Sequence, residues 1–484
     1  MKVPKEVQSV AEKLLGHGFK AYLVGGCLRD LLLKEAPNDW DIATDARPEK
    51  IQEIFPESVY ENQFGTVGVK TENEDQSLRI IQVTTFRVEG SYSDARHPSD
   101  VRFIGRIEED LSRRDFTVNA MAFDLGEDAE IIDPFFGARD LGEKMIRAVG
   151  NPEERFKEDA LRLMRAVRLA TQLGFFIEKE TMSAIRTHAS LLSKIAEERI
   201  RDEFTKLIMT SRAHQGINLM QELGLLKYIL PELCEGVGVS QNKHHIYTVF
   251  EHNVRALEYT VSKNYSLHVR MASLLHDVGK PKTKRGEGND STFYGHEIVG
   301  ARQAFKALDR LRFPRGFVDQ VSHLVRYHLF YYNVDEVTPA GVRRFLARVG
   351  PENVDDLIKV READRIGSGV PKAVPYKLRH LLFMIEKVKR DPVSPKMLAV
   401  RGEDVMSALR IETSPRVGYI LSILLEEVIE NPSYNTKETL MRRIEELGKE
   451  KEEELKVRAL KAKETKEEFE GGMEEEIKKK YWVK

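Results

Sequence analysis

The chain has 484 residues, of which 41% are hydrophobic and 32% are charged, and its formal net charge is −2 at pH 7. This composition excludes collagen-like and generally disordered chains, and at about 100–200 residues per domain the length predicts three or four domains. The near-neutral charge leaves nucleic-acid binding open, because basic and acidic regions can be segregated along a chain.

The number of cysteines and the hydropathy of the chain indicate its cellular compartment. The two cysteines, Cys27 and Cys234, are too few for a disulfide framework, which fits a reducing cytosol. No run approaches the roughly 18 apolar residues of a membrane helix, and the first residues carry no apolar signal-peptide core. We therefore expect a cytoplasmic protein without a membrane-spanning segment.

The N-terminal part of the chain is predicted to be mixed α/β. A helix is expected over 5–18, where apolar residues recur three and four positions apart. Short runs rich in apolar and branched residues then predict strands at 21–24, 41–44, 66–69 and 78–86.

From residue 151 onward the apolar spacing predicts helices almost throughout. We therefore expect an α+β protein in which a small mixed α/β head precedes all-helical regions. The predicted regions are the head (1–150), a helical neck and body (151–238), a histidine-rich helical domain (239–370), a helical C-terminal region (371–447), and a Lys/Glu-rich tail (448–484) that is a solvated helix or disordered.

Two features of the head combine into a candidate site. Gly25 and Gly26 end the first strand and precede Arg29; glycines allow close approach to a ligand, and amides at a helix start suit phosphate. Asp39 and Asp41 enter the next strand, where residues two apart share a face, and adjacent carboxylates repel unless a cation such as Mg²⁺ lies between them. Each feature alone is commonly just a turn, but together they predict phosphoryl or nucleotidyl transfer.

Several segments, spread over about residues 20–210, resemble the class II nucleotidyltransferases, which comprise the CCA-adding tRNA nucleotidyltransferases and the related bacterial poly(A) polymerases. The matching segments in the head are 23–30 (LVGGCLRD), 38–44 (NDWDIAT), 84–87 (TTFR), Asp94 with 96–98 (RHP) in the region of the family's flexible loop, 113–120 (RRDFTVNA) and 133–137 (DPFFG).

This resemblance implies a nucleotidyltransferase head in which Asp39 and Asp41 hold Mg²⁺. The 3′-hydroxyl of an RNA would attack the α-phosphorus of a nucleoside triphosphate, with metal ions easing ionisation of the hydroxyl and steadying the departing pyrophosphate. Such transfer depends on positioning and charge neutralisation, so no covalent enzyme nucleophile is needed. Gly26, Arg29 and Arg114 are the head's candidate contacts to triphosphate and ribose.

The stretch 158–168 is strongly helical in pattern and carries Asp159, Arg162, Arg165 and Arg168. Asp159 and Arg162 are expected as i, i+3 neighbours on one helix, where an ordinary surface salt bridge is the alternative. Asp159 can accept from a base amino group and Arg162 can donate to the base, while Arg165 and Arg168 can contact phosphate. In the family that the chain resembles, a Glu-Asp-x-x-Arg motif serves as a protein template for CTP or ATP, which implies that role for Asp159 and Arg162.

Two further comparisons with the family qualify this picture. The segment 197–203 resembles a family motif that we interpret as support for the template helix. Gln82 occupies a position before the Val-Thr-Thr-Phe-Arg run where the family usually has Glu, so any assistance from a third acidic group is missing in this chain.

Histidines and aspartates mark a second candidate site in the helical domain. An imidazole and carboxylate ligand set fits a divalent transition metal, and the His-Asp pair in an apolar helix is the most discriminating part, since a chain with 13 histidines shows some clustering by chance. The order of ligands resembles an HD domain, which implies a second divalent metal and leaves hydrolysis open. The candidate ligands are His252, His276, Asp277 and Asp364, with His296 and His328 permitting a two-metal arrangement.

The leading hypothesis is an enzyme that adds CCA, or part of it, to the 3′ end of tRNA from CTP and ATP. A poly(A) polymerase and a CC-only or A-only enzyme remain alternatives, as do a metal phosphohydrolase with a nucleotide-binding head and an RNA-binding module without chemistry. Basic residues of the C-terminal region are candidates for contacts to the tRNA backbone, although such runs are usually solvated faces. They are Lys377, Arg379, Lys387, Lys389 and Arg390.

Overall fold

The computed structural model is described as two compact units, Met1–Leu329 with Asp356–Pro371, and Phe330–Asp355 with Lys372–Lys484. Each unit is considered by itself. The residues that the structure describes are 2–62, 65–89, 101–126, 129–242, 246–330, 339–369, 373–390, 398–461 and 481–482.

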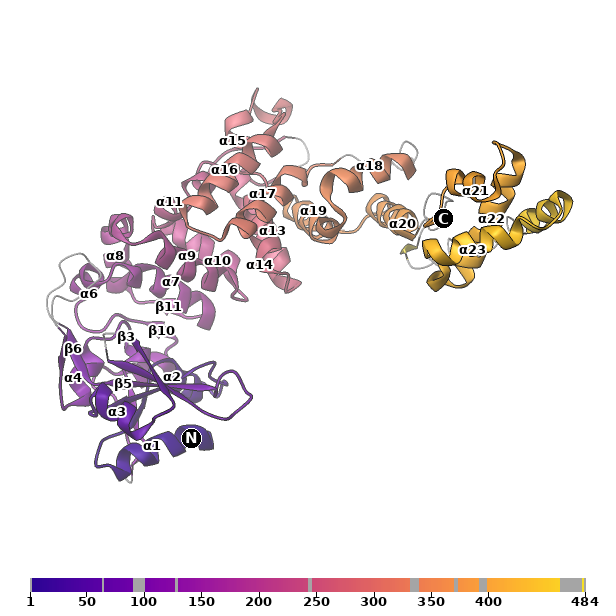
Figure 1. Ribbon diagram of the computed structural model, residues 1–484. Helices are drawn as coiled ribbons and strands as arrows, with labels where there is room; N and C mark the ends of the chain where they lie inside the picture. Colours follow the sequence, from indigo (N-terminus) through magenta and orange to yellow (C-terminus); the bar gives the residue numbers. More distant parts are fainter. Residues whose placement is uncertain are drawn as a thin grey trace. The chain divides into compact units, whose positions relative to one another are not determined.

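A mixed seven-stranded sheet with the order β3-β4-β5-β2-β1-β8-β9 forms the centre of the head (Figure 1). Neighbouring strands are antiparallel except for β2 and β5, which run parallel. A separate antiparallel pair joins β6 to β7. The strands are β1 (Tyr22–Val24), β2 (Trp40–Thr44), β3 (Ser58–Asn62), β4 (Thr66–Lys70), β5 (Ile80–Thr85), β6 (Arg87–Glu89), β7 (Val101–Phe103), β8 (Ala122–Asp124) and β9 (Ile131–Ile132).

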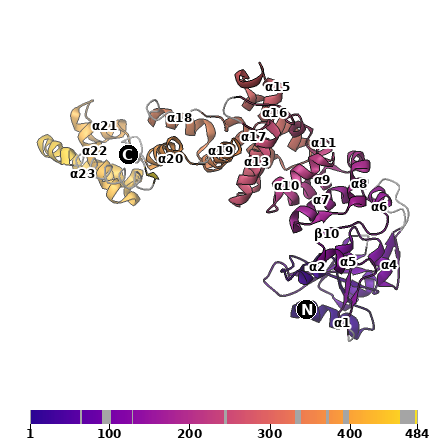
Figure 2. The same cartoon turned by 180° about the vertical axis from the view of Figure 1, so that it is seen from behind.

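Alternation along the strands gives the sheet two different faces. Leu23, Ile42 and Val83 belong to a buried core shared with helices α1 (Lys5–Gly16), α2 (Gly26–Leu32) and α3 (Pro48–Ile54). Figure 1 and Figure 2 both show α1 on the side of the head away from the neck helices.

The opposite face of the sheet carries the polar residues of interest. Tyr22 and Ala43 pack there with Leu111 of α4 (Ile107–Ser112). Asp41 alternates with the core residues of β2, and its register partner on β5 is Gln82, so both lie on this second face. The predicted strands around the Asp pair are therefore present, and Asp39 immediately precedes β2.

Helices dominate the remainder of the first unit, and the predicted α+β class is confirmed. One prediction was wrong in detail: the helix expected across 158–168 is interrupted, because α6 ends at Glu158 and α7 begins at Leu161. The helices and the two short strands of this part are α5 (Gly137–Gly142), β10 (Met145–Ile146), α6 (Pro152–Glu158), α7 (Leu161–Leu173), β11 (Phe176–Ile177), α8 (Lys179–His188), α9 (Glu197–Ile208), α10 (Ala213–Glu222), α11 (Leu226–Ile229), α12 (Pro231–Cys234), α13 (Val249–Ser262), α14 (Leu267–Leu275), α15 (Lys280–Thr283), α16 (His296–Arg310), α17 (Arg315–Tyr327) and α19 (Val354–Gly367).

The second unit is helical and has its own apolar core. Val405, Ile420, Leu424 and Ile444 are buried together there. Leu455 also belongs to this core, although it lies in the segment for which we expected a solvated helix or disorder. The helices of this unit are α18 (Pro339–Val349), α20 (Tyr376–Arg390), α21 (Gly402–Leu409), α22 (Pro415–Glu430) and α23 (Lys437–Leu447). Among the described residues of the whole chain, no helix has both the length and the apolarity to cross a bilayer.

The packing of α5 against the short 3-10 helix Thr117–Asn119 can be tested with one substitution. A Cβ at Gly137 would lie 2.1 Å from the backbone oxygen of Thr117, so Gly137→Ala is expected to destabilise the head by about 2 kcal/mol. Gly142→Ala, at the other end of α5, meets nothing within 4 Å and is expected to be neutral or slightly stabilising. Urea denaturation followed through buried Trp40 measures both; equal stability of the two variants would contradict the close packing.

Candidate active site

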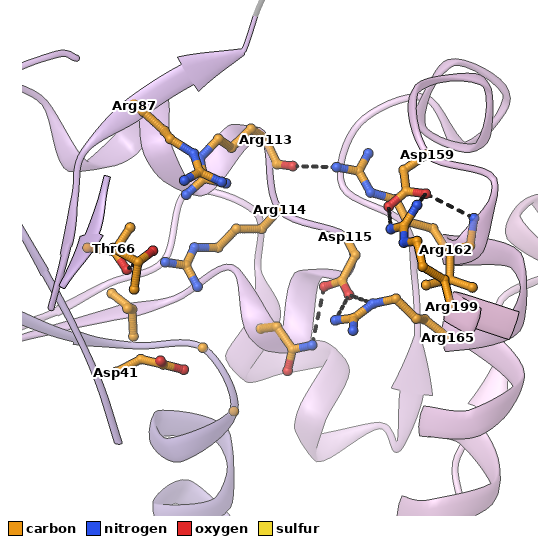
Figure 3. A pocket seen from close by; sticks show the side chains of 16 residues that line it. Asp41, Thr66, Arg87, Arg113, Arg114, Asp115, Asp159, Arg162, Arg165 and Arg199 are labelled. Carbon is orange, nitrogen blue, oxygen red and sulfur yellow. Dashed lines mark hydrogen bonds and ion pairs between the residues drawn. The ribbon is translucent and has the colours of Figure 1, made fainter. Parts of the chain in front are cut away.

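A pocket of about 480 Å³ lies between the second face of the sheet and the neck helices (Figure 3). Six of its lining residues are arginines and three are aspartates, so its side chains suit a polyanion. The lining residues are Val24, Gly25, Gly26, Asp41, Thr66, Thr84, Arg87, Arg113, Arg114, Asp115, Asn119, Asp159, Leu161, Arg162, Arg165 and Arg199.

Asp41 provides the acidic end of the pocket. Gly25 lies beside both its carboxylate and Arg114: a Cβ on this glycine would lie 3.4 Å from Asp41 Oδ2 and 3.1 Å from Arg114 Nη1. Burial and the charge of Asp39 raise the pKa of Asp41 to about 6, although Arg114 acts in the opposite direction. A partly buried carboxylate that is destabilised by a second carboxylate is the donor arrangement that a hard divalent cation would stabilise. The two aspartates therefore fit a metal ion.

Asp159 lies at the opposite end of the pocket, in the break between α6 and α7. Its Oδ1 accepts a hydrogen bond from the backbone N–H of Leu161 at 3.1 Å, so the carboxylate caps the start of α7. Its ion-pair partner is Arg199 of α9, whose Nη2 lies 2.8 Å from Asp159 Oδ2. The surface salt bridge between Asp159 and Arg162, which was the alternative interpretation, is thus replaced by a contact between two segments that are distant in sequence.

Arg162 is held in the first turn of α7 by other partners. Its Nη1 lies 2.6 Å from Glu158 Oε2, and its Nη2 donates to the backbone oxygen of Arg113 at 3.0 Å. Figure 3 shows Arg162 and Asp159 close together, across the pocket from Asp41. An acceptor and a donor therefore lie side by side at this end, which is what recognition of a base edge requires.

A chain of polar contacts runs along the wall of the pocket. Arg165 of α7 pairs with Asp115 at 2.5 Å, Asn119 donates to Asp115 at 3.3 Å, and Arg29 of α2 donates to Asn119 at 2.7 Å. Burial opposes ionisation of Asp115, but the charge and hydrogen bond of Arg165, the charge of Arg162 and the hydrogen bond from Asn119 together outweigh burial and lower the pKa of Asp115 below its ordinary value. The chain of contacts therefore joins the head to the helix that carries Arg162.

The structure separates the residues predicted from the sequence into two groups. Those brought together in the pocket are Gly26, Asp41, Arg114, Asp159, Arg162 and Arg165. Those outside its lining are Asp39, Arg29 and Arg168. Arg29 is engaged by Asp30 and Asn119, and Arg168 by Glu203 of α9 and Gln172, so these two arginines hold parts of the protein together.

Sequence reasoning gave no individual role to several residues of the lining. Arg87, Arg113, Asp115, Asn119 and Arg199 all lie within segments that resemble family motifs, and membership of those segments was the signal that pointed to them. Thr84 also lies in such a segment, whereas Thr66, its cross-strand partner on β4, does not. The predicted loop residues Asp94 and 96–98 lie outside the described residues.

The predicted metal ligands of the helical domain lie together in the fold. Ligand atoms of His252, His276, Asp277 and Asp364 lie within 4.8 Å of one another, and all four residues are buried. A second group around the same Asp277 contains His296 and His328; the cluster draws on α13, the ends of α14, α16 and α17, and α19. Helices distant in sequence thus converge on one aspartate.

Hydrogen bonds orient three of these imidazoles toward Asp277. The Nδ1 atoms of His276, His296 and His328 each lie 2.7 Å from the carbonyl oxygen three residues earlier. That contact places the proton on Nδ1 and leaves the lone pair on Nε2, a tautomer assigned from the hydrogen-bond network. The three Nε2 atoms lie 3.3, 3.3 and 3.6 Å from Asp277. Oriented imidazoles around carboxylates fit divalent transition metals.

Comparisons with known proteins match both regions of the chain that carry these sites. Family models match residues 21–147 (Poly A polymerase head domain), 174–236 (Probable RNA and SrmB- binding site of polymerase A) and 249–368 (HD domain). The CCA-adding enzyme of Enterococcus faecalis is 33% identical over 449 residues, which cover 90% of this chain and 94% of that enzyme. The enzyme of Streptococcus mutans is 49% identical over 222 residues, covering 45% of this chain and 54% of its own length.

Solved structures show the same fold. The crystal structure of the Bacillus stearothermophilus CCA-adding enzyme in complex with CTP is 29% identical, with a TM-score of 0.59 over 92% of this chain and 98% of that chain. The Thermotoga maritima CCA-adding enzyme complexed with tRNA_CCA has a TM-score of 0.52 at 20% identity, covering 91% of this chain and 95% of that chain.

We predict that the histidine cluster binds a divalent metal ion. His276→Ala removes one ligand at the centre of the cluster, and we expect it to weaken Mn²⁺ or Zn²⁺ binding by more than about tenfold. His323→Ala, on α17 but outside the cluster, serves as the matched control and should bind as the parent does. Calorimetric titration of metal-stripped protein measures both, and equal affinities in the two variants would contradict the assignment.

Proposed function

The chain belongs to the family of CCA-adding enzymes, and from this premise we propose that it adds CCA to the 3′ end of tRNA from CTP and ATP and releases pyrophosphate. One observation carries the proposal: a single pocket has the carboxylate of Asp41 at one end and the neighbouring side chains of Asp159 and Arg162 at the other. The relative from Enterococcus faecalis, similar over nearly the whole length of both chains, supports CCA addition over poly(A) synthesis.

The base-selecting end of the pocket explains how CTP and ATP are chosen without a template strand. Cytosine and adenine both present an amino donor beside a ring-nitrogen acceptor, whereas uracil and guanine present a carbonyl and a ring N–H there. Asp159 accepts from the amino group, and Arg162 donates to the adjacent acceptor. Arg199 fixes the carboxylate of Asp159, and Glu158 fixes Arg162, so the pattern is preformed.

The other end of the pocket binds the triphosphate. Arg87, Arg113 and Arg114 gather on one side of it, with Arg114 facing Asp41 (Figure 3). Guanidinium groups neutralise phosphate charge and hold the α-phosphorus in place for the 3′-hydroxyl of tRNA. Gly25 and Gly26 leave room for the phosphates at the turn after β1.

Asp39 and Asp41 would hold Mg²⁺, which when bound supplies ionisation of the attacking hydroxyl and charge stabilisation for the departing pyrophosphate. Gln82 stands next to Asp41 across the β2–β5 pair, and as a neutral amide it adds no third negative charge. In the second unit, Lys377, Arg379 and Lys387 of α20 are proposed contacts for the tRNA backbone; the side chains of Lys389 and Arg390 lie outside the described ones.

A second activity is proposed for the histidine cluster, because its oriented imidazoles and carboxylates fit a site for one or two divalent metals. Metal-dependent hydrolysis of a phosphate ester is the chemistry that such a set supports. It uses none of the residues of the nucleotide pocket, so the two activities are separable by substitution.

The proposed activity is tested with tRNA that lacks its 3′ end, read at single-nucleotide resolution. CTP alone should add two residues, ATP should add one only afterwards, and Asp41→Asn should slow extension by about a hundredfold or more. Asp277→Asn is the matched control: it should spare extension and remove any hydrolysis of a 2′,3′-cyclic phosphate to the ring-opened monophosphate, which Asp41→Asn should spare. Extension that stops after CC, adds only A or continues with ATP would identify the alternative activities instead.

Selection of the base should depend on Arg162. Arg162→Ala removes the donor for the ring acceptor, and we expect incorporation of UTP relative to CTP to rise by about tenfold. The control is Arg186→Ala, which breaks the exposed pair with Glu222 outside the pocket. Competition between CTP and UTP on one tRNA gives the ratio; an unchanged ratio in Arg162→Ala would remove this residue from the selecting pair.

A further inference from the structure

One carboxylate outside the pocket lining controls its phosphate end. Asp110 of α4 is 1% exposed, and its oxygens lie 2.8 Å from Arg113 Nη2 and 3.1 Å from Arg114 Nη2. The backbone N–H of Arg87 also donates to it, at 3.3 Å. The side chains of Arg113 and Arg114 and the main chain of Arg87 are therefore tied to a single buried acid.

Arg114 lies between two acids that compete for it. Its Nη2 is held by Asp110, while its Nη1 and Asp41 Oδ2 both come within contact distance of the same point above Gly25. A glycine leaves no side chain to keep Arg114 and Asp41 apart. Without Asp110, the guanidinium of Arg114 would be free to turn and pair with Asp41. A hydrogen bond between these two charged groups is stronger than one between neutral groups.

We infer that Asp110 is a positioning residue for the triphosphate: it holds Arg113 and Arg114 as a preformed phosphate receptor and keeps Arg114 from closing onto Asp41. The inference rests on the proposed function, in which this end of the pocket receives the triphosphate. Preformed donors bind without the cost of being ordered during binding. The same contact leaves the charge of Asp41 available to a cation.

Whether loss of Asp110 weakens or strengthens anion binding distinguishes this positioning role from a purely electrostatic one. Asp110 is an acid close to a site for a polyanion, so loss of its charge alone would strengthen anion binding. Loss of the positioning contact would weaken it, because Arg114 is then captured by Asp41. A role in stability alone would lower the melting temperature and leave the affinity of the folded protein unchanged.

The probe is inorganic tripolyphosphate, titrated calorimetrically into the full-length protein without metal at a temperature where circular dichroism shows every variant folded. Asp110→Asn is expected to weaken tripolyphosphate binding by about tenfold, and Asp110→Glu should recover part of the loss. The matched control is Asp140→Asn. Asp140 is also buried and paired with an arginine, Arg147, but it does not line the pocket, so binding should be unchanged.

A double-substitution cycle tests the competition with Asp41. If Asp41 captures the freed Arg114, then Asp110→Asn should have a clearly smaller effect in an Asp41→Asn background than in the parent. An equal effect in both backgrounds would overturn the competition. Unchanged or tighter tripolyphosphate binding by folded Asp110→Asn, or no binding by the parent, would overturn the positioning role.

These experiments measure tripolyphosphate binding and not tRNA extension. The positioning role of Asp110 and the proposed CCA addition can therefore be refuted separately. A parent that binds tripolyphosphate in an Asp110-dependent way but does not extend tRNA would refute the proposed function alone. A parent that extends tRNA while Asp110→Asn binds tripolyphosphate normally would refute the positioning role alone.

Discussion

The ion pair between Asp115 and Arg165 is the contact on which the geometry of the pocket depends. Asp115 belongs to the head and Arg165 to α7, and Asn119 and Arg29 extend the contact into α2. Asp115 is buried, whereas Arg165 is partly exposed, and displacement of Arg165 would leave the charge of Asp115 without its partner in a low-dielectric environment. This cost holds Asp41 on the sheet and the Asp159 and Arg162 side chains at the start of α7 close to one separation.

The same arrangement recurs around the pocket: five arginines of its lining (Arg113, Arg114, Arg162, Arg165 and Arg199) are each held by an acid. Arg162 has Glu158, Arg199 has Asp159, and Asp110 serves two arginines at once. Clustered guanidinium groups repel one another, and these acids make the cluster compatible with a folded protein. The histidine cluster follows a related logic with different chemistry, since backbone carbonyls fix the protons on Nδ1 and direct the lone pairs toward Asp277.

The sequence predicted the chemistry of both sites better than the partnerships within them. The Asp41 strand, the glycine turn and the order of the histidines depend on local pattern, and the structure places them as expected. The roles of Arg29, Arg165 and Arg168 were harder to predict, because an arginine reveals its charge but not its partner. Their partners lie 90, 50 and 35 residues away in the chain. The break at Asp159 was missed because no proline or glycine marks it.

Gly25 shows how narrowly the sequence is constrained at this site. Its backbone, with φ 76° and ψ −141°, lies in a region that only glycine occupies readily. Any Cβ there would also fill the space between Asp41 and Arg114. These two costs are independent. One is the strain of a positive φ on a residue with a Cβ, and the other is the loss of ligand space, so an amino acid that lowers one cost does not lower the other. Substitution of another amino acid at position 25 is therefore expected to carry a cost in the main chain and to narrow the ligand space.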